Sequence, residues 1–247
     1  MDEKLKLENI RNVLIRQEET IIFSLIERAQ YKINNKIYEP GAFEIQDFDG
    51  SFCDFYLYQS ECVDSKIRRF TAPDQYPFFN DLPKPVIPLD KVDSPIINTA
   101  ININQKLKDI YINQLVPYIC ASGDDGQYGS GVLCDKLCLR ALSNRIHYGM
   151  FVAESKFQNQ TDEYLALVAN NDREGIMALL TNEEVEERLL ARVKKKAATY
   201  GQDPGDVTNS YKIEPIHVVE IYHRWIIPLT KQVEVDYLME RGRNYQC

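Results

Sequence analysis

Residues 126–157 read GQYGSGVLCDKLCLRALSNRIHYGMFVAESKF, and their pattern indicates an all-helical protein. Arg145 and Lys156 lie eleven residues apart in this segment. At about 100° per residue, that spacing returns both side chains to nearly one helix face, roughly three turns apart, so an elongated anion could lie between them. The apolar residues keep to helical spacing and predict one long helix behind a Gly-rich loop; they are Val132, Leu139, Leu142, Ile146, Phe151 and Val152.

The composition is that of an ordinary globular protein. The 247 residues are 44% hydrophobic and 27% charged, with a mean hydropathy of -0.38. We expect one domain over residues 1–247, folded as a single multi-helix bundle. No apolar run is long enough to cross a bilayer, and the N-terminal residues MDEKLKLENIR lack the apolar segment of a secretory signal, so we expect a cytoplasmic location.

Charge and cysteine content exclude several kinds of partner. The net charge of -8 disfavours nucleic acid and anionic membranes, which bind basic faces. Cys134 and Cys138 are one helical turn apart, but none of the three histidines has metal-ligand spacing, so we predict no metal site. The six cysteines indicate no disulfide scaffold; they are Cys53, Cys62, Cys120, Cys134, Cys138 and Cys247.

Helical periodicity continues on both sides of the opening segment. Residues 5–31 predict a long amphipathic first helix, and residues 51–70 a second helix that ends in Arg68 and Arg69. Six of the eleven prolines fall between Pro73 and Pro95, so residues 70–100 are expected to form an irregular surface connection. A further helix is expected from residue 102 to 120, kinked or restarted at Pro117.

The Gly-rich loop at residues 122–131 could cradle a phosphate. It lacks the GK[ST] ending and follows a predicted helix, which favours an ordinary interhelical loop. After it we expect short helices at residues 161–169 and 172–180. Thr181 and Glu184 form a capping-box pattern that predicts the start of a charged helix extending to residue 198, with residues 192–196 on a solvated face.

The last predicted helix covers residues 214–241 and is interrupted at Pro228, and residues 243–247 are expected to form a frayed tail. The run HVVEIY inside this region also fits a buried helix, so the whole chain is predicted to be all-α.

Three further sets of polar residues deserve weighing beside Arg145 and Lys156. Arg11 lies on the first predicted helix, while Asn182 with Glu186 and Thr230 with Glu234 form pairs four residues apart. Residues at this spacing share a helix face and can contact one ligand together. The alternative is that each is a solvated surface group, which is the commoner state of such residues.

The sequence resembles the all-helical chorismate mutases of yeasts and plants. The similarity extends along nearly the whole chain and is carried by the blocks LENIRNVLIRQEETIIFSLIERAQ, KIRRFTAPDQYPFF, YGSGVLCDKLCLRALSNRIHYGMFVAESKF, LLTNEEVEERLLARVKKKAATYGQDP and WIIPLTKQVEVDYLMER. It implies an isomerase that converts chorismate to prephenate by an intramolecular Claisen rearrangement, in the branch of the shikimate pathway toward phenylalanine and tyrosine. It implies neither a cofactor nor a covalent intermediate. The residues that match the family's active site are Arg11, Arg145, Lys156, Asn182, Glu186, Thr230 and Glu234.

These residue types suit that reaction. Chorismate carries two carboxylates, and we expect Arg11 and Arg145 to bind them and hold the compact reactive shape. Lys156 and Glu234 are expected to meet the ether oxygen, on which negative charge develops as its bond to carbon breaks. Glu234 can donate there only when protonated, so its pKa is expected to be raised. Supporting hydrogen bonds are assigned to Asn182 and Thr230, and a contact with the ring hydroxyl to Glu186.

The resemblance also implies a homodimer with an effector site for tyrosine and tryptophan at its interface. Arg68, Arg69, Gly129 and Ser130 match positions of that site, whereas Leu133 and Glu214 replace threonines of the yeast form. Two alternatives keep the fold but change the function. A catalytically silent relative that binds aromatic metabolites or proteins would be expected to lack a site residue. An exported mutase that acts on a host's pathway would be expected to carry a signal peptide.

Overall fold

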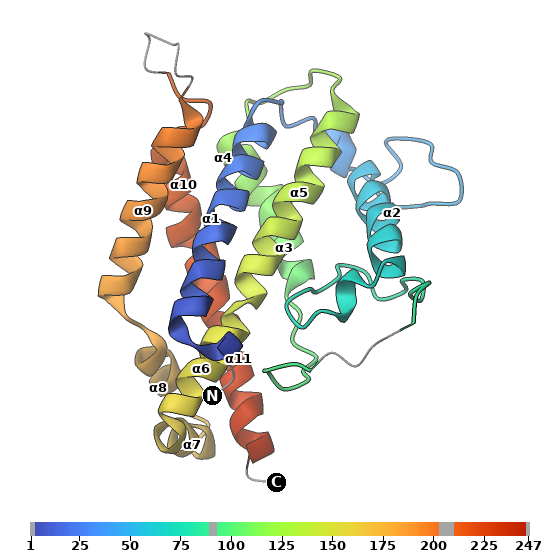
Figure 1. The fold of residues 1–247 in the computed structure, drawn as a ribbon. Helices are drawn as coiled ribbons and strands as arrows, with labels where there is room; N and C mark the ends of the chain where they lie inside the picture. The colour runs from blue at the N-terminus through green and yellow to red at the C-terminus, as the bar shows by residue number, and fades with distance from the viewer. Residues whose placement is uncertain (1–2, 89–92, 203–209, 246–247) are drawn as a thin grey trace.

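The computed structural model describes residues 3–88, 93–202 and 210–245, and these residues contain helices and connections but no β-strand. A single bridge pairs Gln202 with Tyr211. Helix α5 (Tyr128–His147) runs through the middle of the molecule, between α1 (Leu7–Ala29) and α2 (Phe52–Lys66) (Figure 1). The predicted all-α fold is confirmed.

The predicted helix at residues 126–157 is present as two consecutive helices. α5 ends at His147, and α6 (Gly149–Asn159) begins after Tyr148. Tyr148 has φ -62° and ψ -14°, and this ψ is too small to continue a regular α-helix, so the chain bends there. The sequence pattern did not reveal this bend, because the apolar spacing continues through it.

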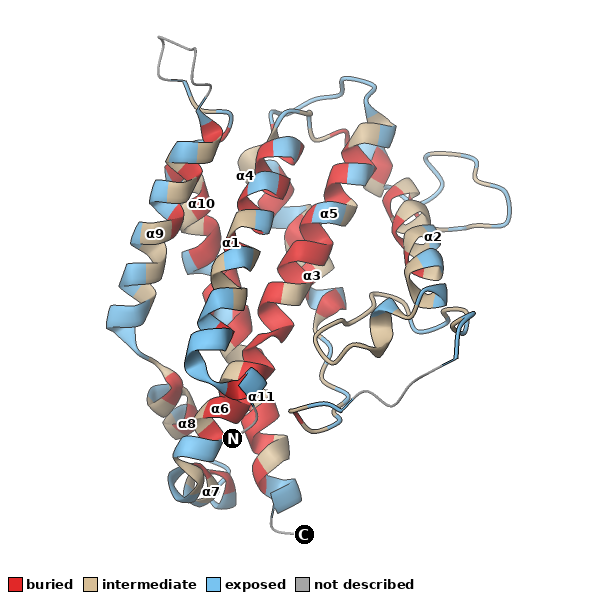
Figure 2. Ribbon diagram, in the orientation of Figure 1, coloured by how far each residue is buried: buried red, intermediate tan, exposed pale blue. Residues whose placement is uncertain are grey.

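α1 begins after the short helix η1 (Glu3–Leu5) and buries its apolar face against α5. Helix α9 (Glu183–Gly201) packs against another side of α1, and α10 (Pro215–Ile221) packs against α9 (Figure 1). Figure 2 shows that α5 is mostly buried and that α9 exposes much of its outer face. The predicted first helix is confirmed.

A buried polar network holds α1 to α5. The Arg28 guanidinium donates from Nε to Asp135 Oδ1 at 2.6 Å, and neither side chain is exposed. Tyr38, at the end of η2 (Asn35–Tyr38), and Tyr111 donate to the same carboxylate at 2.8 and 2.7 Å. All four groups therefore satisfy each other away from water.

The second predicted helix is shorter than expected. α2 ends at Lys66, and Arg68 then adopts a left-handed φ of 70° before the short helix η3 (Arg69–Thr71). The described part of the Pro-rich connection that follows contains no regular helix beyond η3, as predicted, although residues 89–92 lie outside the described ranges. Glu61 of α2 accepts hydrogen bonds from the backbone N–H of Phe78 and Phe79, which holds the connection against the bundle.

The two predicted proline positions differ in outcome: an α-helix restarts with Pro117 in its first turn, as predicted, whereas the helical conformation continues without the predicted interruption at Pro228. α3 (Asn104–Ile110) continues through a π-helical turn, η4 (Tyr111–Leu115), into α4 (Val116–Ile119). α10 continues in the same way through η5 (Tyr222–Ile226) into α11 (Ile227–Tyr245). Pro117 and Pro228 each follow a π turn by two residues, and the wider turn makes room for the proline ring, which would clash with the carbonyl four residues earlier in a regular α-helix.

α11 also extends beyond the predicted end. Arg243 lies in its last turn and donates to Asn171 Oδ1 at 3.2 Å, so the frayed tail predicted at residues 243–247 is wrong as far as Tyr245. Cys247 lies outside the described residues.

The short helices α7 (Thr161–Ala169) and α8 (Arg173–Leu180) match their predictions, but the capping box does not. Asn182 is the residue that caps α9, because its Oδ1 accepts from the backbone N–H of Val185 at 3.1 Å. Thr181 instead donates back to the carbonyl of Met177 in α8 at 2.8 Å. The Thr181 hydroxyl is thus bound to the last turn of α8, and Asn182 caps α9 instead.

The predicted solvated face at residues 192–196 is only partly correct. Arg192 and Lys196 pair with the fully buried carboxylate of Glu18 on α1, at 2.6 and 3.2 Å. Lys194 and Lys195 are exposed. Arg192 and Lys196 of α9 therefore point toward α1, where they pair with a carboxylate that is distant in sequence.

The Gly-rich loop predicted at residues 122–131 connects α4 to α5 as an ordinary interhelical loop, but it ends before residue 128, because residues 128–131 already form the first turn of α5. Its Asp125 accepts hydrogen bonds from the backbone N–H of Lys32 and Gln127, at 2.8 and 2.9 Å. Among the described helices, none has the length and apolar character needed to span a membrane. In the same residues, no three His, Cys, Asp or Glu side chains gather as potential metal ligands.

Candidate active site

The end of α5, the last turn of α6 and the first turns of α11 converge on one cluster of polar side chains. Arg145 is only 5% exposed, and its Nη1 donates to Thr230 Oγ1 at 3.4 Å. Its Nε is buried without a hydrogen-bond partner, and no carboxylate among the described residues pairs with it. A buried guanidinium without a counter-ion is costly, which marks this position as a place for an anion.

Lys156 supplies a second cation on α6. Its Nζ donates to the carbonyl of Leu180, the last residue of α8, and no carboxylate in the described chain forms an ion pair with it. Lys156 and Arg145 both act electrostatically on Glu234. The bend at Tyr148 therefore does not separate the two cations that the sequence predicted on one face.

Gly149 allows α6 to lie close against α11. A Cβ atom at this position would lie 2.9 Å from Thr230 Cγ2 and 3.1 Å from Glu234 Cγ. Side chains at such distances must move apart. The absence of a side chain at Gly149 thus leaves room for both α11 residues at their observed positions.

Glu234 is 7% exposed and forms no hydrogen bond with a described residue. Burial raises its pKa to about 7, and the charge of Glu186 adds to the rise. The cations Lys156, Arg145 and Lys231 oppose it. The carboxyl group is therefore about half protonated at neutral pH and can serve as a hydrogen-bond donor there.

The remaining predicted residues lie at the edge of this cluster. Glu186, in the first turn of α9, pairs with Lys231 at 2.6 Å. Asn182 is exposed and caps α9, and Arg11 is exposed on the second turn of α1. Neither of these two hydrogen-bonds to the cluster within the described chain.

Several residues near the cluster were missed by the sequence analysis. The hydroxyl groups of Tyr164 and Tyr222 are buried without a partner. Burial raises the pKa of Tyr164 to about 12, with Glu234 adding to the rise, and burial likewise raises the pKa of Tyr222, which lies near Arg145. Lys231 was also missed. No spacing signal relates Tyr164 or Tyr222 to the groups that they approach, because those groups lie on other helices, whereas Lys231 could have been found from its position three residues before Glu234.

The residues matched to an effector site fall into two separate places. Arg69 lies near Arg140, whose pKa is lowered by burial and by the charge of Arg69. Gly129 and Ser130 form the first turn of α5, eleven residues before Arg140, which corresponds to about 16 Å along the helix. Arg68 precedes Arg69 in the left-handed conformation. One copy of the chain does not bring these two groups together.

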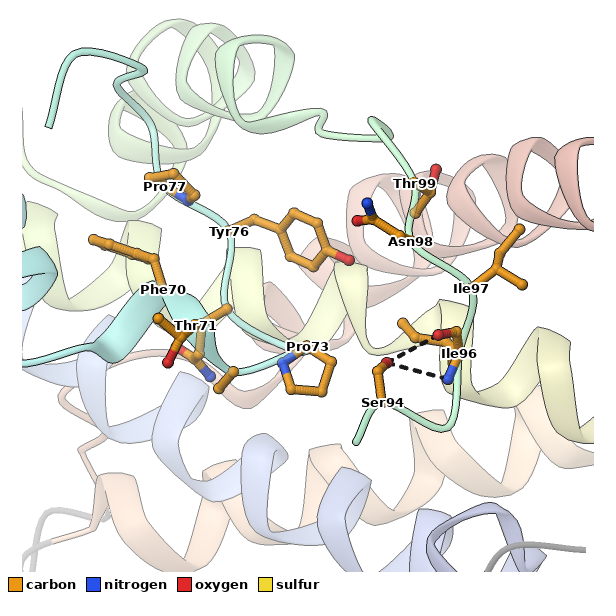
Figure 3. Close-up of a pocket in the computed structure, with 12 residues that line it drawn as sticks. Phe70, Thr71, Pro73, Tyr76, Pro77, Ser94, Ile96, Ile97, Asn98 and Thr99 are labelled. Carbon is orange, nitrogen blue, oxygen red and sulfur yellow. Dashed lines mark hydrogen bonds between the residues drawn. The ribbon is translucent and has the colours of Figure 1, made fainter. Parts of the chain in front are cut away.

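A cavity of about 400 Å³ lies elsewhere, between two arms of the Pro-rich connection (Figure 3). Residues 70–77 form one arm and residues 94–99 the other, with the Tyr76 ring between them. No charged side chain lines this cavity, so it offers no neutralisation for a dicarboxylate.

Comparison with known proteins identifies the family of this chain. Residues 132–235 match the family model for chorismate mutase type II. The chain is 44% identical to a chorismate mutase of Schizosaccharomyces pombe, and the match covers 98% of each chain. It is 43% identical to the chloroplastic chorismate mutase 1 of Arabidopsis thaliana, over 97% of this chain and 75% of the relative. The chain belongs to the chorismate mutase family.

Solved chorismate mutases have the same fold. The Candida albicans enzyme in complex with L-tryptophan superposes with a TM-score of 0.92 at 40% identity, covering 96% of this chain and 92% of that one. AtCM1 with tyrosine bound in its allosteric site superposes with a TM-score of 0.89 at 44% identity, and the match covers 97% of this chain and 98% of that one. The chain is thus a helical chorismate mutase, which converts chorismate to prephenate, and the family, fold and activity predicted from the sequence are confirmed.

Proposed function

We propose that the cluster of Arg145, Lys156 and Glu234 is the active site in which chorismate rearranges to prephenate. The observation that supports this most strongly is a pair of cations with no carboxylate counter-ion in the described chain, next to a buried carboxyl group. Chorismate brings two carboxylates and an ether oxygen, which complement these charges.

Arg145 is assigned to one carboxylate of chorismate. Its Nε has no partner within the protein, while Nη1 is steadied by the Thr230 hydroxyl. A planar guanidinium can give two parallel hydrogen bonds to a carboxylate, which fixes both position and orientation. We assign Arg11, exposed near the start of α1, to the other carboxylate. Holding both ends selects the compact shape from which the reaction proceeds.

Lys156 and Glu234 are assigned to the ether oxygen. As the carbon–oxygen bond breaks, the new carbon–carbon bond forms within the same molecule, and no proton is transferred. The negative charge that develops on the oxygen is stabilised by donors that are already in place. With its pKa raised to about 7, Glu234 supplies one such donor while it is protonated. Lys156 supplies the other.

Glu186 and Asn182 are assigned to the polar rim of the site. Glu186 lies in the first turn of α9, where its pair with Lys231 leaves Oε2 available to accept from the ring hydroxyl of chorismate. Asn182 uses Oδ1 to cap α9, so its amide N–H groups are the part available to a ligand.

The test compares Arg145→Ala and Lys156→Ala with two controls outside the cluster, Arg173→Ala and Lys195→Ala. Chorismate disappearance is followed by absorbance, and circular dichroism checks folding. Each cluster variant is expected to lose roughly 100-fold or more in kcat/KM, whereas each control should stay within about twofold of wild type. Wild-type turnover in a folded Arg145 or Lys156 variant would place the active site elsewhere.

We further propose that two copies form a homodimer that binds aromatic amino acids. Val63 on α2 and Ile67, directly after that helix, are 60% and 61% exposed, and Leu133 and Leu137 on the adjoining α5 are 45% and 44% exposed. Such apolar surface suits an interface with a second copy. A second copy would also allow Arg68 and Arg69 of one chain to meet Gly129 and Ser130 of the other.

Relatives support the effector proposal, since their structures contain L-tryptophan, tyrosine or phenylalanine, the latter two in an allosteric site. The mass of the protein in solution tests the dimer. Calorimetric titration of tryptophan and of tyrosine into wild type and Arg69→Ala tests the effector site. A monomer would refute the dimer, and wild-type protein that binds neither amino acid would refute the effector site.

We also propose that residues 1–247 act as one domain in the cytoplasm. One hydrophobic core includes residues from α1 through α11, which supports the single domain. The five cysteines within the described part are free thiols, in keeping with a reducing compartment. Cell fractionation would test the location.

A further inference from the structure

Lys231 is a cation at the edge of the cluster that has no place in the assignments above. It follows Thr230 in α11, and its Nζ lies 2.6 Å from Glu186 Oε1 on α9. The side chains of Lys231 and Glu186 are 20% and 29% exposed, so the pair is largely shielded from water. Among the described residues it is the one polar side-chain link between α9 and α11.

This link matters because α9 packs mainly against α1 and α10 rather than α11. Glu186 therefore has little else to fix its position relative to the residues on α11. The carboxylate of Glu186 lies in the first turn of α9, where the helix dipole favours negative charge. Lys231 completes this arrangement by holding one oxygen and leaving the other free.

Lys231 also acts on the second acidic group of the cluster. It lies three residues before Glu234 on α11, close to one helical turn. It is one of the cations that oppose the rise in the pKa of Glu234, which burial causes and Glu186 reinforces. The polar groups that act on Glu234 from the elements packed around it are Arg145 on α5, Lys156 on α6, Tyr164 on α7, Glu186 on α9 and Lys231 on α11. On α8, Arg173 is paired with Asp236.

We propose that Lys231 is a positioning residue that serves both carboxyl groups of the site, holding Glu186 toward the ring hydroxyl of chorismate and setting the pH above which turnover is lost. This inference rests on the proposed function of Glu186 and Glu234. A cation whose only task was to stabilise the fold would not affect the pH dependence of turnover in this way.

Substitutions at Lys231 and Glu186 are expected to have opposite effects on the alkaline limb, which is the part of the pH profile where turnover falls as pH rises. Lys231→Met removes a charge that lowers the pKa of Glu234, so the limb moves to higher pH, by about half a unit for partly exposed charges. Glu186→Gln removes a charge that raises the same pKa, so the limb moves to lower pH. The double variant removes both charges and brings the limb back close to that of wild type.

Substrate binding provides an independent readout. In Lys231→Met, Glu186 loses its anchor, so KM for chorismate rises by roughly three- to tenfold, while kcat below pH 6 changes little. Lys231→Arg keeps the charge and the donors and restores both KM and the limb. Lys106→Met is the matched control. Lys106 is exposed and lies outside the cluster, and it hydrogen-bonds to Gln232, the residue that follows Lys231.

The experiment measures kcat and KM for chorismate from pH 5 to 9 in wild type, these variants and Glu234→Gln. Opposite shifts in the single variants, near cancellation in the double variant and no shift in Lys106→Met are expected. An unshifted limb in folded Lys231→Met, or one moved to lower pH, overturns the inference. If Lys231→Met does not fold, Glu186→Gln and Lys231→Arg provide the test. An unshifted alkaline limb in Glu186→Gln, or a shifted alkaline limb in Lys231→Arg, overturns the inference.

The Glu234→Gln variant separates this inference from the proposed function beneath it. If that variant keeps the wild-type alkaline limb, the proposed role of Glu234 fails. If the limb disappears in Glu234→Gln but is unmoved in Lys231→Met, only the role of Lys231 fails.

Discussion

Replacing Glu234 by glutamine changes both activity and stability in directions that its burial dictates. The carboxyl group is 7% exposed and has a pKa of about 7, against an ordinary value of 4.5. At about 1.36 kcal/mol per pKa unit, this rise corresponds to roughly 3 kcal/mol between the protonated and ionised forms. Glutamine has a similar shape and carries no charge at any pH.

The sign for stability follows from the raised pKa. The folded protein binds this proton more tightly than the unfolded chain does. Its contribution to the free energy of unfolding is therefore complete below pH 4.5, falls as pH rises through 7, and is absent above that. Glu234→Gln does not lose this free energy of unfolding as pH rises, because glutamine does not ionise. Relative to wild type, the variant should gain up to roughly 3 kcal/mol of stability on going from pH 4 to pH 8.

Activity should follow the same protonation. With a pKa of about 7, half of Glu234 is protonated at pH 7 and about a tenth at pH 8. Wild-type turnover should therefore fall about tenfold for each pH unit above the pKa. Glu234→Gln should retain substantial turnover and lose this fall, whereas Glu234→Ala should be nearly inactive throughout. The assays are chorismate turnover and urea unfolding from pH 4 to 9. An identical alkaline limb in wild type and Glu234→Gln would refute the protonated-donor role.

Three further changes test other parts of the structure. Gly149→Ala should cost about 1 to 3 kcal/mol in urea unfolding and reduce turnover, because the methyl group displaces Thr230 and Glu234; unchanged turnover would contradict the close approach of α6 to α11. Arg11→Lys should recover little of the activity lost in Arg11→Ala, because an ammonium group cannot give the paired hydrogen bonds of a guanidinium; near-full turnover would show that charge alone suffices. Asp135→Asn should destabilise the fold by roughly 3 to 5 kcal/mol, because it leaves Arg28 buried without a counter-ion; a urea midpoint equal to that of wild type would contradict this.

The helices and the cation pair could be predicted because their signals are local. Apolar spacing identified nearly every long helix, and the eleven-residue interval between Arg145 and Lys156 placed both cations toward one site despite the bend at Tyr148. Spacing also singled out Glu234 beside Thr230, and the resemblance to a family then supplied its role, which depends on burial that periodicity alone does not reveal.

The errors arose where a local signal competed with the packing of distant residues. Thr181 and Asn182 are both good capping residues, and the end of α8 decided between them. Pro228 predicted an interruption of the last helix, but the π-helical turn before it leads into α11 without a break. Buried Glu18 pairs with cations more than 170 residues away, a contact that no sequence spacing can express.

The most direct measurement is a crystal structure of the protein with a rigid bicyclic dicarboxylate that mimics the chair-like transition state. Such a ligand should bind more tightly than chorismate, because the site complements the transition state. Its carboxylates should contact Arg145 and Arg11, and its ether oxygen should lie within hydrogen-bond distance of Lys156 Nζ and the Glu234 carboxyl group. A ligand bound in the uncharged cavity beside Tyr76, or bound with its ether oxygen away from Lys156 and Glu234, would contradict the proposed active site.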